Sequence, residues 1–447
     1  MNDANAGRIR PYDANPFYWQ LKGKPLLLLG GSVEDNLFQI PDIEEHLDLL
    51  VSAGGNYVRC TMSSRDEGNV WPFERDPKTG LYDLAKPGVE YWKRFERFCR
   101  LAAERDVVAQ FEMWDRFDFA REPWQLNPYN PRNNVNYSAS ESGLKEAIDT
   151  HPGKRESAFF RSVPALENNT RLLRYQQAQV DKMLSISLPF GNTLYCMDNE
   201  TNESPEWGAY WAGYIRSKAA EAGVTVQTTE MWDAPDLAEP QHAHTSDHPE
   251  VYTFCDISQN SHNPADAHWK NMQAFRERIA RSGHTRPINT VKIYGANTGA
   301  YGSSRDAQER FWRNVFGGLA SSRFHRPPAG LGLSPRAQAN IRSCRILTDA
   351  MHLFTCVPHL DLLSQRSWNE AYCIANPGVK YAVYFPDGGD VLLNVSACGD
   401  APLTVRWLEI WECTWSEPET ASAEDGRLRL ETPRDWGYWA ALVTTKT

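Results

Sequence analysis

The sequence predicts an α/β protein in which a repeated strand–helix unit precedes a small antiparallel domain. Apolar runs of strand length alternate with segments of helical spacing through the first 366 of the 447 residues, and this alternation is typical of parallel sheets. After about Ser367 the helical spacing stops, and short alternating segments are separated by turns such as Pro386-Asp387-Gly388-Gly389. We therefore expect two domains, residues 1–366 and 367–447.

The first part contains eight predicted strands in order, and helical segments follow all but one of them. Residues 17–20 and 25–31 flank the turn Leu21-Lys22-Gly23-Lys24, which predicts an N-terminal hairpin leading into the first parallel strand. The other strands are expected at 56–62, 107–115, 192–200, 224–230, 251–259, 287–294 and 321–326. Helical spacing follows at 43–53, 91–106, 168–188, 207–222, 268–282, 307–319 and 337–353. Eight such strands are the count that closes a (β/α)8, or TIM, barrel.

The tail is expected to form a small antiparallel β-sandwich. Its alternating segments lie at 371–374, 381–385, 391–395, 403–407, 428–430 and 439–443. Alternation over short runs bounded by turn residues is the pattern of half-buried antiparallel strands. We expect the sandwich to support the barrel.

Composition and charge exclude several functions. The net charge of −10 argues against a nucleic-acid surface, and no apolar run is long enough to span a membrane. The nine cysteines include no CxxC pair, and no glycine-rich phosphate loop or apolar leader is visible. His242, His244 and His248 lack a Cys or Glu partner pattern, so a solvated loop is expected there. We predict no metal, no cofactor and a cytoplasmic location, with a removed signal peptide as the alternative.

Aromatic residues point to a carbohydrate ligand. The chain has 16 Trp, 18 Tyr and 18 Phe, and many of the tryptophans stand beside turn or polar residues. Flat aromatic faces stack on the apolar faces of sugar rings. The alternative for any single tryptophan is ordinary core packing.

The fourth strand ends in three polar residues. Residues 192–200 read Asn-Thr-Leu-Tyr-Cys-Met-Asp-Asn-Glu, so an apolar run delivers Asn199 and Glu200 at its carboxyl end. That end is where an α/β barrel places its chemistry. A carboxylic acid there can protonate a leaving oxygen if its pKa is raised, and an amide can hydrogen-bond a sugar hydroxyl. The alternative is a helix N-cap, with Glu200 complementing the helix dipole.

The chain resembles the clan A glycoside hydrolases, in particular apiosidase-like and cellulase-like barrels with a C-terminal sandwich named for collagen binding. Matching segments span nearly the whole chain: Leu28-Leu29-Gly30-Gly31, Asp198-Asn199-Glu200, Asp256-Ile257-Ser258-Gln259, Tyr381 to Gly389, Arg406-Trp407, Thr432-Pro433 and Trp439. The resemblance implies that Glu200 is the acid/base and that Asn199 contacts the sugar next to the cleaved bond.

Strand seven departs from this family. Clan A enzymes place a nucleophilic glutamate at its end, whereas residues 289–295 read Asn-Thr-Val-Lys-Ile-Tyr-Gly, with Val291 or Lys292 at the expected place. Another carboxylate could serve, and we favour Glu230 at the end of strand five, then Asp115 at the end of strand three. The alternative for Glu230 is a surface carboxylate before a helix, and the alternatives for Asp115 are an ion pair with the adjacent Arg116 and a loop cap. Otherwise the enzyme inverts through a carboxylate-held water, or the protein is an inactive sugar binder.

Further expected substrate contacts stand at strand ends. Lys292, Arg323, His325 and Arg326 form a cationic set, which predicts either an acidic group on the substrate or a salt-bridge set that holds nearby carboxylates. Other expected contacts are Trp114, Trp232, His262 and Tyr294. The long segment 116–162 is expected to wall the mouth of the barrel.

These observations together predict a glycoside hydrolase that cleaves an oligo- or polysaccharide. Glu200 is the expected general acid, with Glu230 or Asp115 as the second carboxylate. The alternatives are a catalytically silent carbohydrate-binding barrel and a polysaccharide lyase that uses Lys292 as its base. The sequence predicts neither the sugar nor the oligomeric state.

Overall fold

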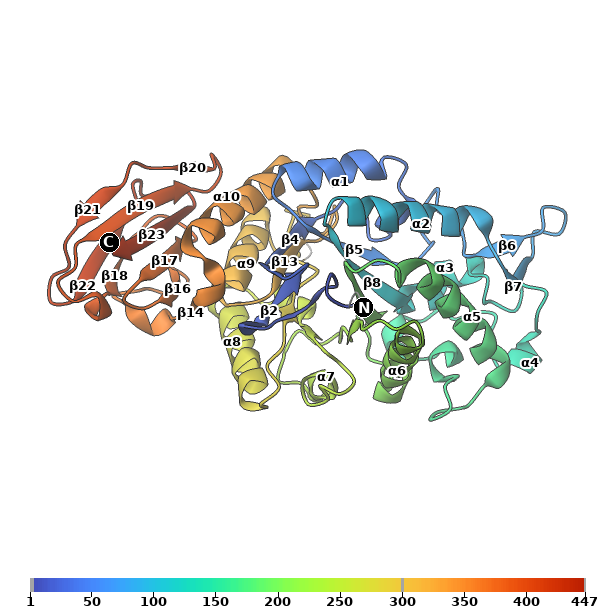
Figure 1. Ribbon diagram of the computed structural model, residues 1–447. Coiled ribbons are helices and arrows are strands. Elements are labelled where there is room, and N and C mark those ends of the chain that lie inside the picture. The colour runs from blue at the N-terminus through green and yellow to red at the C-terminus, as the bar shows by residue number, and fades with distance from the viewer. Residues whose placement is uncertain (1–3, 299–300, 446–447) are drawn as a thin grey trace.

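The computed structural model describes residues 4–298 and 301–445 of a mixed α/β chain (Figure 1). Six parallel strands form its central sheet, in the order β10-β9-β8-β5-β4-β13. Their bounds are Leu28–Gly31 (β4), Tyr57–Thr61 (β5), Val108–Asp115 (β8), Thr193–Asn199 (β9), Gln227–Thr229 (β10) and Ser321–Phe324 (β13). The predicted α/β class is confirmed, and these strands fall where the apolar runs predict them.

The remaining two parallel strands form a separate short sheet, so the eight strands are not one continuous ladder. β11 (Cys255–Asp256) forms its ladder with β12 (Ile288–Asn289). Single parallel bridges, Met231↔Asp256 and Ile293↔Phe324, span the gaps on either side. Side chains interrupt the ladder of backbone hydrogen bonds. Ser321 Oγ accepts from the N–H of Thr290, and Ser258 Oγ accepts from the N–H of Val291. Such local side-chain bonds compete with strand pairing.

In the described part of the chain, seven long helices pack around the parallel strands (Figure 1). They are α1 (Ile43–Ser52), α2 (Val89–Glu104), α5 (Thr170–Ser187), α6 (Pro205–Glu221), α8 (Ala265–Arg281), α9 (Ser304–Phe316) and α10 (Pro335–Met351). Each follows a strand and turns its apolar stripe inward, as α2 does with Tyr91, Phe95 and Phe98. Inside the strands lies a second apolar cluster that includes Leu28, Leu194 and Val291.

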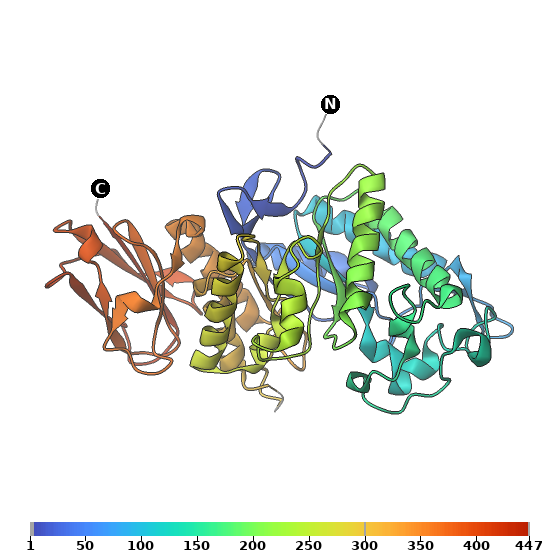
Figure 2. The same cartoon turned by 90° about the horizontal axis from the view of Figure 1, so that it is seen from below.

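The N-terminal hairpin closes the amino end of the strands. It consists of β1 (Arg10–Tyr12), β2 (Asn15–Leu21) and β3 (Lys24–Leu26), and lies opposite the short helices of the segment 116–162 (Figure 2). Trp19 is completely buried, and its indole N–H donates to Asn289 Oδ1 at 2.9 Å. The hairpin therefore plugs one end of the strands and leaves the carboxyl end for the site.

The C-terminal strands are antiparallel, as predicted. One sheet has the order β14-β16-β17-β23-β19-β20 with β21 paired to β19, and the other has the order β15-β18-β22. The bounds are Val357–Pro358 (β14), Leu363–Ser364 (β15), Tyr372–Asn376 (β16), Lys380–Phe385 (β17), Asp390–Asn394 (β18), Leu403–Glu409 (β19), Thr414–Trp415 (β20), Glu419–Ala421 (β21), Arg427–Glu431 (β22) and Trp439–Thr445 (β23). The domain boundary at 366/367 remains a prediction. Two strands that lie before it in the sequence, β14 and β15, already pair with these sheets.

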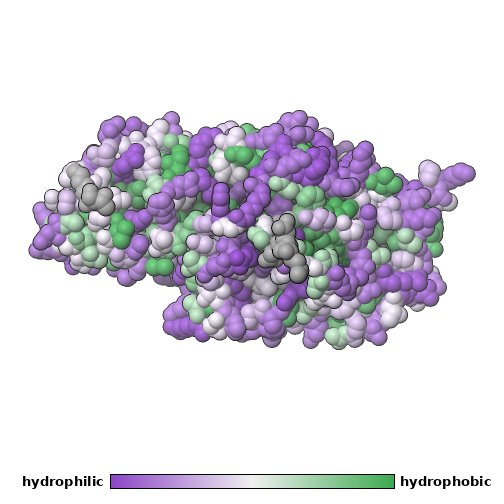
Figure 3. Space-filling model, in the orientation of Figure 1, coloured by the Kyte–Doolittle hydropathy of each residue, from purple (hydrophilic) through white to green (hydrophobic). Residues whose placement is uncertain are grey.

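The C-terminal sheets pack on α9 and α10. The rings of Trp312 and Tyr384 stack with centroids 5.4 Å apart, and Ser343 Oγ donates to the carbonyl of Ile410 at 2.6 Å. Polar side chains predominate on the face shown in Figure 3, with apolar ones scattered among them. Among the described residues, no helix is long and apolar enough to cross a membrane.

Candidate active site

An open cleft of about 450 Å³ lies at the carboxyl ends of the parallel strands. Glu200 and Asn199 contribute to it from the end of β9, and the segment 116–162 forms one wall, as predicted for that long loop. Its lining is Asp35, Arg59, Arg65, Phe117, Ala120, Arg121, Glu122, Pro123, Pro152, Asn199, Glu200, Lys292, His325 and Arg326. The cleft therefore gathers side chains from strand ends that are far apart in sequence.

Glu200 is held by two residues of the seventh unit. Its Oε1 accepts from Lys292 Nζ at 2.5 Å and from the Tyr294 hydroxyl at 2.6 Å. The Glu200 side chain is 15% exposed, whereas that of Lys292 is 1% exposed. Lys292 thus lies against Glu200 in the part of the site where the family resemblance leads one to expect a second carboxylate.

These contacts keep Glu200 ionised. Burial alone would raise the pKa of its carboxyl, but the Lys292 ammonium and the hydrogen bonds from Lys292 and Tyr294 hold the pKa well below its ordinary value. Its backbone is left-handed, with φ of +51°. A non-glycine residue in this region costs about 1–3 kcal/mol and persists where surrounding structure enforces it, often at functional sites.

A chain of hydrogen bonds continues from Glu200 across the cleft floor. Asn199 Oδ1 accepts from Lys292 Nζ and, at 2.9 Å, from Arg59 Nη2. The Arg59 guanidinium is fully buried and also contacts Glu112 at 2.6 Å and Asp35. Because the Asn199 oxygen has two cationic donors, its amide nitrogen is the part of the group left to donate to a ligand.

The predicted cationic set has divided roles. Arg326 Nε donates to Asp35 Oδ2 at 2.7 Å, which is the salt-bridge alternative. Arg323 is buried beneath the cleft, donates to the carbonyl of Val291 at 2.6 Å, and has its pKa lowered by burial to about 10. Burial lowers the pKa of His325 to about 3, so its 3.6 Å contact with Asp35 is not an ion pair at neutral pH.

The structure does not bring Glu230 to Glu200. Glu230 is 1% exposed, does not line the cleft, and accepts from the backbone N–H of Asp198 at 2.8 Å and of Met231 at 3.1 Å. Its second oxygen lies against the backbone of Gly208 in α6, where a Cβ atom would collide with it. Burial raises the pKa of Glu230 to about 8. The expectation that strands four and five place both carboxylates in one cleft is therefore not met.

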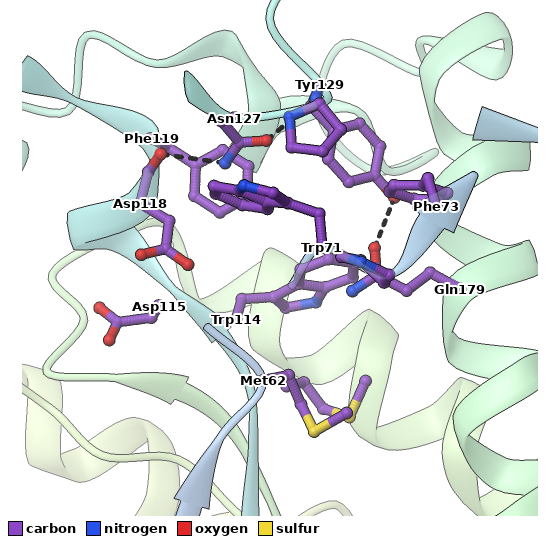
Figure 4. A pocket seen from close by; sticks show the side chains of 13 residues that line it. Met62, Trp71, Phe73, Trp114, Asp115, Asp118, Phe119, Asn127, Tyr129 and Gln179 are labelled. Atoms are coloured by element: carbon purple, nitrogen blue, oxygen red, sulfur yellow. Dashed lines mark hydrogen bonds between the residues drawn. The ribbon is translucent and has the colours of Figure 1, made fainter. Parts of the chain in front are cut away.

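Asp115 also lies outside the cleft. Figure 4 shows it with Asp118 at one side of a small pocket that Trp71 and Trp114 line. Asp115 Oδ1 accepts from the N–H of Phe117 at 3.1 Å, and Oδ2 pairs with Arg65 at 2.6 Å. These are a loop cap and an ion pair, the alternatives to a catalytic role, although the cation is Arg65 and not the adjacent arginine.

The predicted aromatic contacts divide in the same way. Trp114 is buried among the rings of Phe159 and Trp211, and Trp232 donates its indole N–H to Thr245 Oγ1 at 2.7 Å. Neither lines the Glu200 cleft. His262 stacks on Tyr301 with centroids 4.2 Å apart, beside Tyr294. Of the four predicted contacts, Tyr294 is the one that hydrogen-bonds Glu200 within the described residues.

Several cleft residues are missing from the sequence-based prediction. Arg59 is a charged residue inside an otherwise apolar strand, which is a usable signal. Asp35 stands in the polar loop after the first parallel strand. Glu122 and Arg121 lie in the long 116–162 segment, where nothing in the local pattern distinguishes them from other polar loop residues.

Comparison with known proteins shows the fold. No family model and no curated protein sequence matches this chain. A solved glycoside hydrolase is 11% identical with a TM-score of 0.66, covering 100% of this chain and 98% of its own. A family 5 glycoside hydrolase from Bacteroides vulgatus is 13% identical with a TM-score of 0.66, covering 100% and 95%. An α-amylase from Geobacillus thermoleovorans, complexed with acarbose, is 10% identical with a TM-score of 0.56, covering 94% and 99%.

This chain shares its fold with solved glycoside hydrolases, and the predicted resemblance to clan A glycoside hydrolases is confirmed at the level of the fold. The likeness extends over the whole chain, so it includes the C-terminal antiparallel sheets as well as the parallel strands. At 11–13% identity it carries no assignment of residues. Roles in the cleft therefore rest on the geometry described above.

Proposed function

We propose that this protein is a glycoside hydrolase whose reaction takes place at Glu200. The observation that carries the proposal is the Glu200 carboxylate itself, strained and partly exposed in a cleft at the carboxyl ends of parallel strands. We also infer that the eight strands form a (β/α)8 barrel, closed by the bridges Met231↔Asp256 and Ile293↔Phe324. The substrate class is a carbohydrate, in keeping with the fold and with the cleft's donors and acceptors.

The contacts of Glu200 favour a role as an ionised carboxylate. With the Lys292 ammonium at 2.5 Å, the carboxyl is charged at neutral pH, so it can attack the anomeric carbon or take a proton from an attacking water. The general-acid role expected from the sequence requires that the substrate first displace Lys292. Asn199, whose amide nitrogen has no hydrogen-bond partner in the described part of the chain, would hold a sugar hydroxyl beside it.

The second carboxylate belongs among those that line the cleft. Besides Glu200 these are Asp35 and Glu122. Asp35 is committed to Arg59 and Arg326, and although burial would raise its pKa, these cations hold it well below the ordinary value. Glu122 is exposed on α3 (Arg121–Leu126), and in the described part of the chain no cation pairs with it. Glu122 is therefore the candidate that donates the proton to the leaving oxygen.

Aryl glycosides with different leaving groups separate these roles. A dinitrophenyl leaving group needs no protonation, so a Glu122→Gln enzyme should hydrolyse it normally while losing activity on an unactivated glycoside. Glu200→Gln should lose activity on both. Retained dinitrophenyl activity in Glu200→Gln would instead identify Glu200 as the acid. The anomeric configuration of the first product, read by NMR, distinguishes attack by Glu200 from attack by water.

A catalytically silent sugar-binding protein is the second candidate. The specific observation in its favour is the Lys292–Glu200 ion pair, which neutralises the carboxylate that would react. In that case wild type and Glu200→Gln should bind the same glycans and form no product. An unsaturated product that absorbs ultraviolet light would instead indicate elimination, with Lys292 or Tyr294 as the base.

A further inference from the structure

Four large aromatic side chains are exposed in the described part of the chain. Tyr301 is 47% exposed, Trp368 69%, Trp411 41% and Trp436 63%, and the other large apolar side chains that are exposed are all aliphatic. Large aromatic rings are usually buried, and exposed ones often mark a binding surface. The four residues are far apart in the sequence, so their position in the fold decides whether they form one surface.

Tyr301 lies at the rim of the Glu200 cleft. Its ring is 4.6 Å from that of Tyr294, whose hydroxyl donates to Glu200 at 2.6 Å. His262 stacks on Tyr301 with an interplanar angle of 12°. One ring, that of Tyr294, therefore separates Tyr301 from the reacting carboxylate.

Helix α9, which begins three residues after Tyr301, leads from this rim to the C-terminal sheets. Arg305 in its first turn pairs with Asp387 at 3.2 Å, in the turn between β17 and β18. Gln308, also near the start of α9, accepts from the indole N–H of Trp411 at 2.7 Å. The Trp411 ring lies 4.9 Å from that of Tyr438. Trp411 thus stands over the start of the helix that follows the cleft.

Trp436 and Trp368 lie on two loops that meet the same β17–β18 turn. A Cβ on Gly388 of that turn would lie 2.6 Å from the backbone nitrogen of Trp436, and one on Gly389 would lie 3.1 Å from Glu370 Oε1. The loop of Trp368 is also fixed to α9, because Asn369 Nδ2 donates to Glu309 Oε2 at 3.1 Å. Both exposed tryptophans therefore lie beside the beginning of α9.

The four rings share the side of the molecule that carries the cleft. In a β/α unit the helix begins where the strand ends, so the first turns of α9 lie at the carboxyl end of the strands, as Glu200 does. Tyr301, Trp411, Trp436 and Trp368 all attach to these turns or to loops that contact them. We call this set the aromatic track.

We propose that the aromatic track binds a polysaccharide chain that extends from the Glu200 cleft onto the C-terminal domain. The proposal rests on the proposed function, since the track is useful only if the cleft takes a glycan. Single flat rings separated by polar residues suit stacking on successive sugars, whereas a protein partner would require a contiguous apolar patch. The Arg336 guanidinium lies over the Trp411 ring at 4.6 Å, and that of Arg434 lies over the Trp436 ring at 5.2 Å, so each of these two rings is held in place by a neighbouring cation.

Affinity electrophoresis tests the track independently of catalysis. Native gels would contain hydroxyethyl cellulose, xylan, galactomannan, polygalacturonate or alginate, and would compare wild type with Trp368→Ala/Trp436→Ala. The control is Val89→Ala/Val135→Ala, because Val89 is 83% and Val135 62% exposed elsewhere on the surface. We expect at least one polymer to retard the wild type and the control equally, with about tenfold weaker retardation of the tryptophan variant.

Kinetics separate this inference from the proposed function. If both hold, the tryptophan variant should show a raised KM on the retarding polymer and an unchanged kcat/KM on a small aryl glycoside. Retardation that depends on the tryptophans without any hydrolysis would support the track and contradict the hydrolase. Hydrolysis with equal retardation of all three proteins, or no retardation of the wild type by any polymer, would overturn the track.

Discussion

The buried carboxyl pair of Glu230 and Asp198 makes stability depend on pH. Burial, together with the charge of neighbouring carboxylates, raises the pKa of Glu230 to about 8 and that of Asp198 well above its ordinary value. In the unfolded chain such groups titrate near 4. Between these values the folded protein holds protons that the unfolded chain has lost, so the free energy of unfolding falls as the pH rises.

The magnitude follows from proton linkage. Each carboxyl that is protonated only in the folded state lowers the free energy of unfolding by about 1.4 kcal/mol per pH unit. From pH 5 to pH 8, Glu230 alone accounts for a loss of about 4 kcal/mol on this basis. A Glu230→Gln variant keeps the acceptor for the backbone N–H groups of Asp198 and Met231 and cannot ionise. Its stability should fall by about 1.4 kcal/mol less per pH unit than that of the wild type.

Urea unfolding between pH 5 and pH 8 measures this difference. The control is Glu67→Gln, because Glu67 is exposed and its replacement should leave the pH dependence of the wild type unchanged. Curves of unfolding free energy against pH that run parallel for wild type and Glu230→Gln would refute the reasoning. Such curves would mean that Glu230 is already ionised in the folded protein and that a cationic group other than its known contacts stabilises the charge.

Three further substitutions test the surroundings of Glu200 and Glu230. Lys292→Met removes the cation beside Glu200, so the pKa of the Glu200 carboxyl should rise. The acidic limb of a kcat/KM–pH profile should therefore move to higher pH, and an unmoved limb would contradict the role of the ion pair. Gly208→Ala inserts a methyl group that collides with Glu230 and lies 2.8 Å from the Tyr252 hydroxyl. Thermal unfolding should show that the free energy of unfolding falls by about 1–3 kcal/mol. A variant as stable as the wild type would contradict this packing. Arg59→Met leaves the buried Glu112 without its ion-pair partner and removes one of the two arginines that contact Asp35. Urea unfolding should therefore show a loss of about 3–5 kcal/mol, and a loss below about 1 kcal/mol would contradict the network.

Local patterns predicted much of the fold. The long apolar strands β8 and β9 and the amphipathic helix α2 lie where periodicity places them, because each buries a face that the sequence marks clearly. β11 and β12 are only two residues long, although their apolar runs suggested more. There the hydroxyls of Ser258 and Ser321 accept hydrogen bonds from backbone N–H groups of another segment. The residues next to β11 and β12 in the sequence cannot reveal such bonds, because the two partners are far apart in the chain.

The site was predicted in part for a similar reason. Glu200 and Asn199 were found because a strand end is visible in the sequence, and Lys292 because it interrupts an expected motif. Their partners depend on contacts between distant segments, such as Arg59 with Asn199, 140 positions away. The direction of the Glu230 side chain was equally hidden, because it depends on contacts with the backbone of Asp198 and Gly208, which lie in other segments of the chain.

Turnover by Glu200→Gln tests the central claim most directly. Wild type and the variant, matched in folding by circular dichroism, would be incubated with the same glycans and aryl glycosides, and released sugar would be quantified. If the carboxylate at position 200 performs the reaction, the wild type should release sugar and the amide variant should be slower by about a hundredfold or more. Equal release from both proteins would remove Glu200 from the chemistry and leave the cleft without its proposed function.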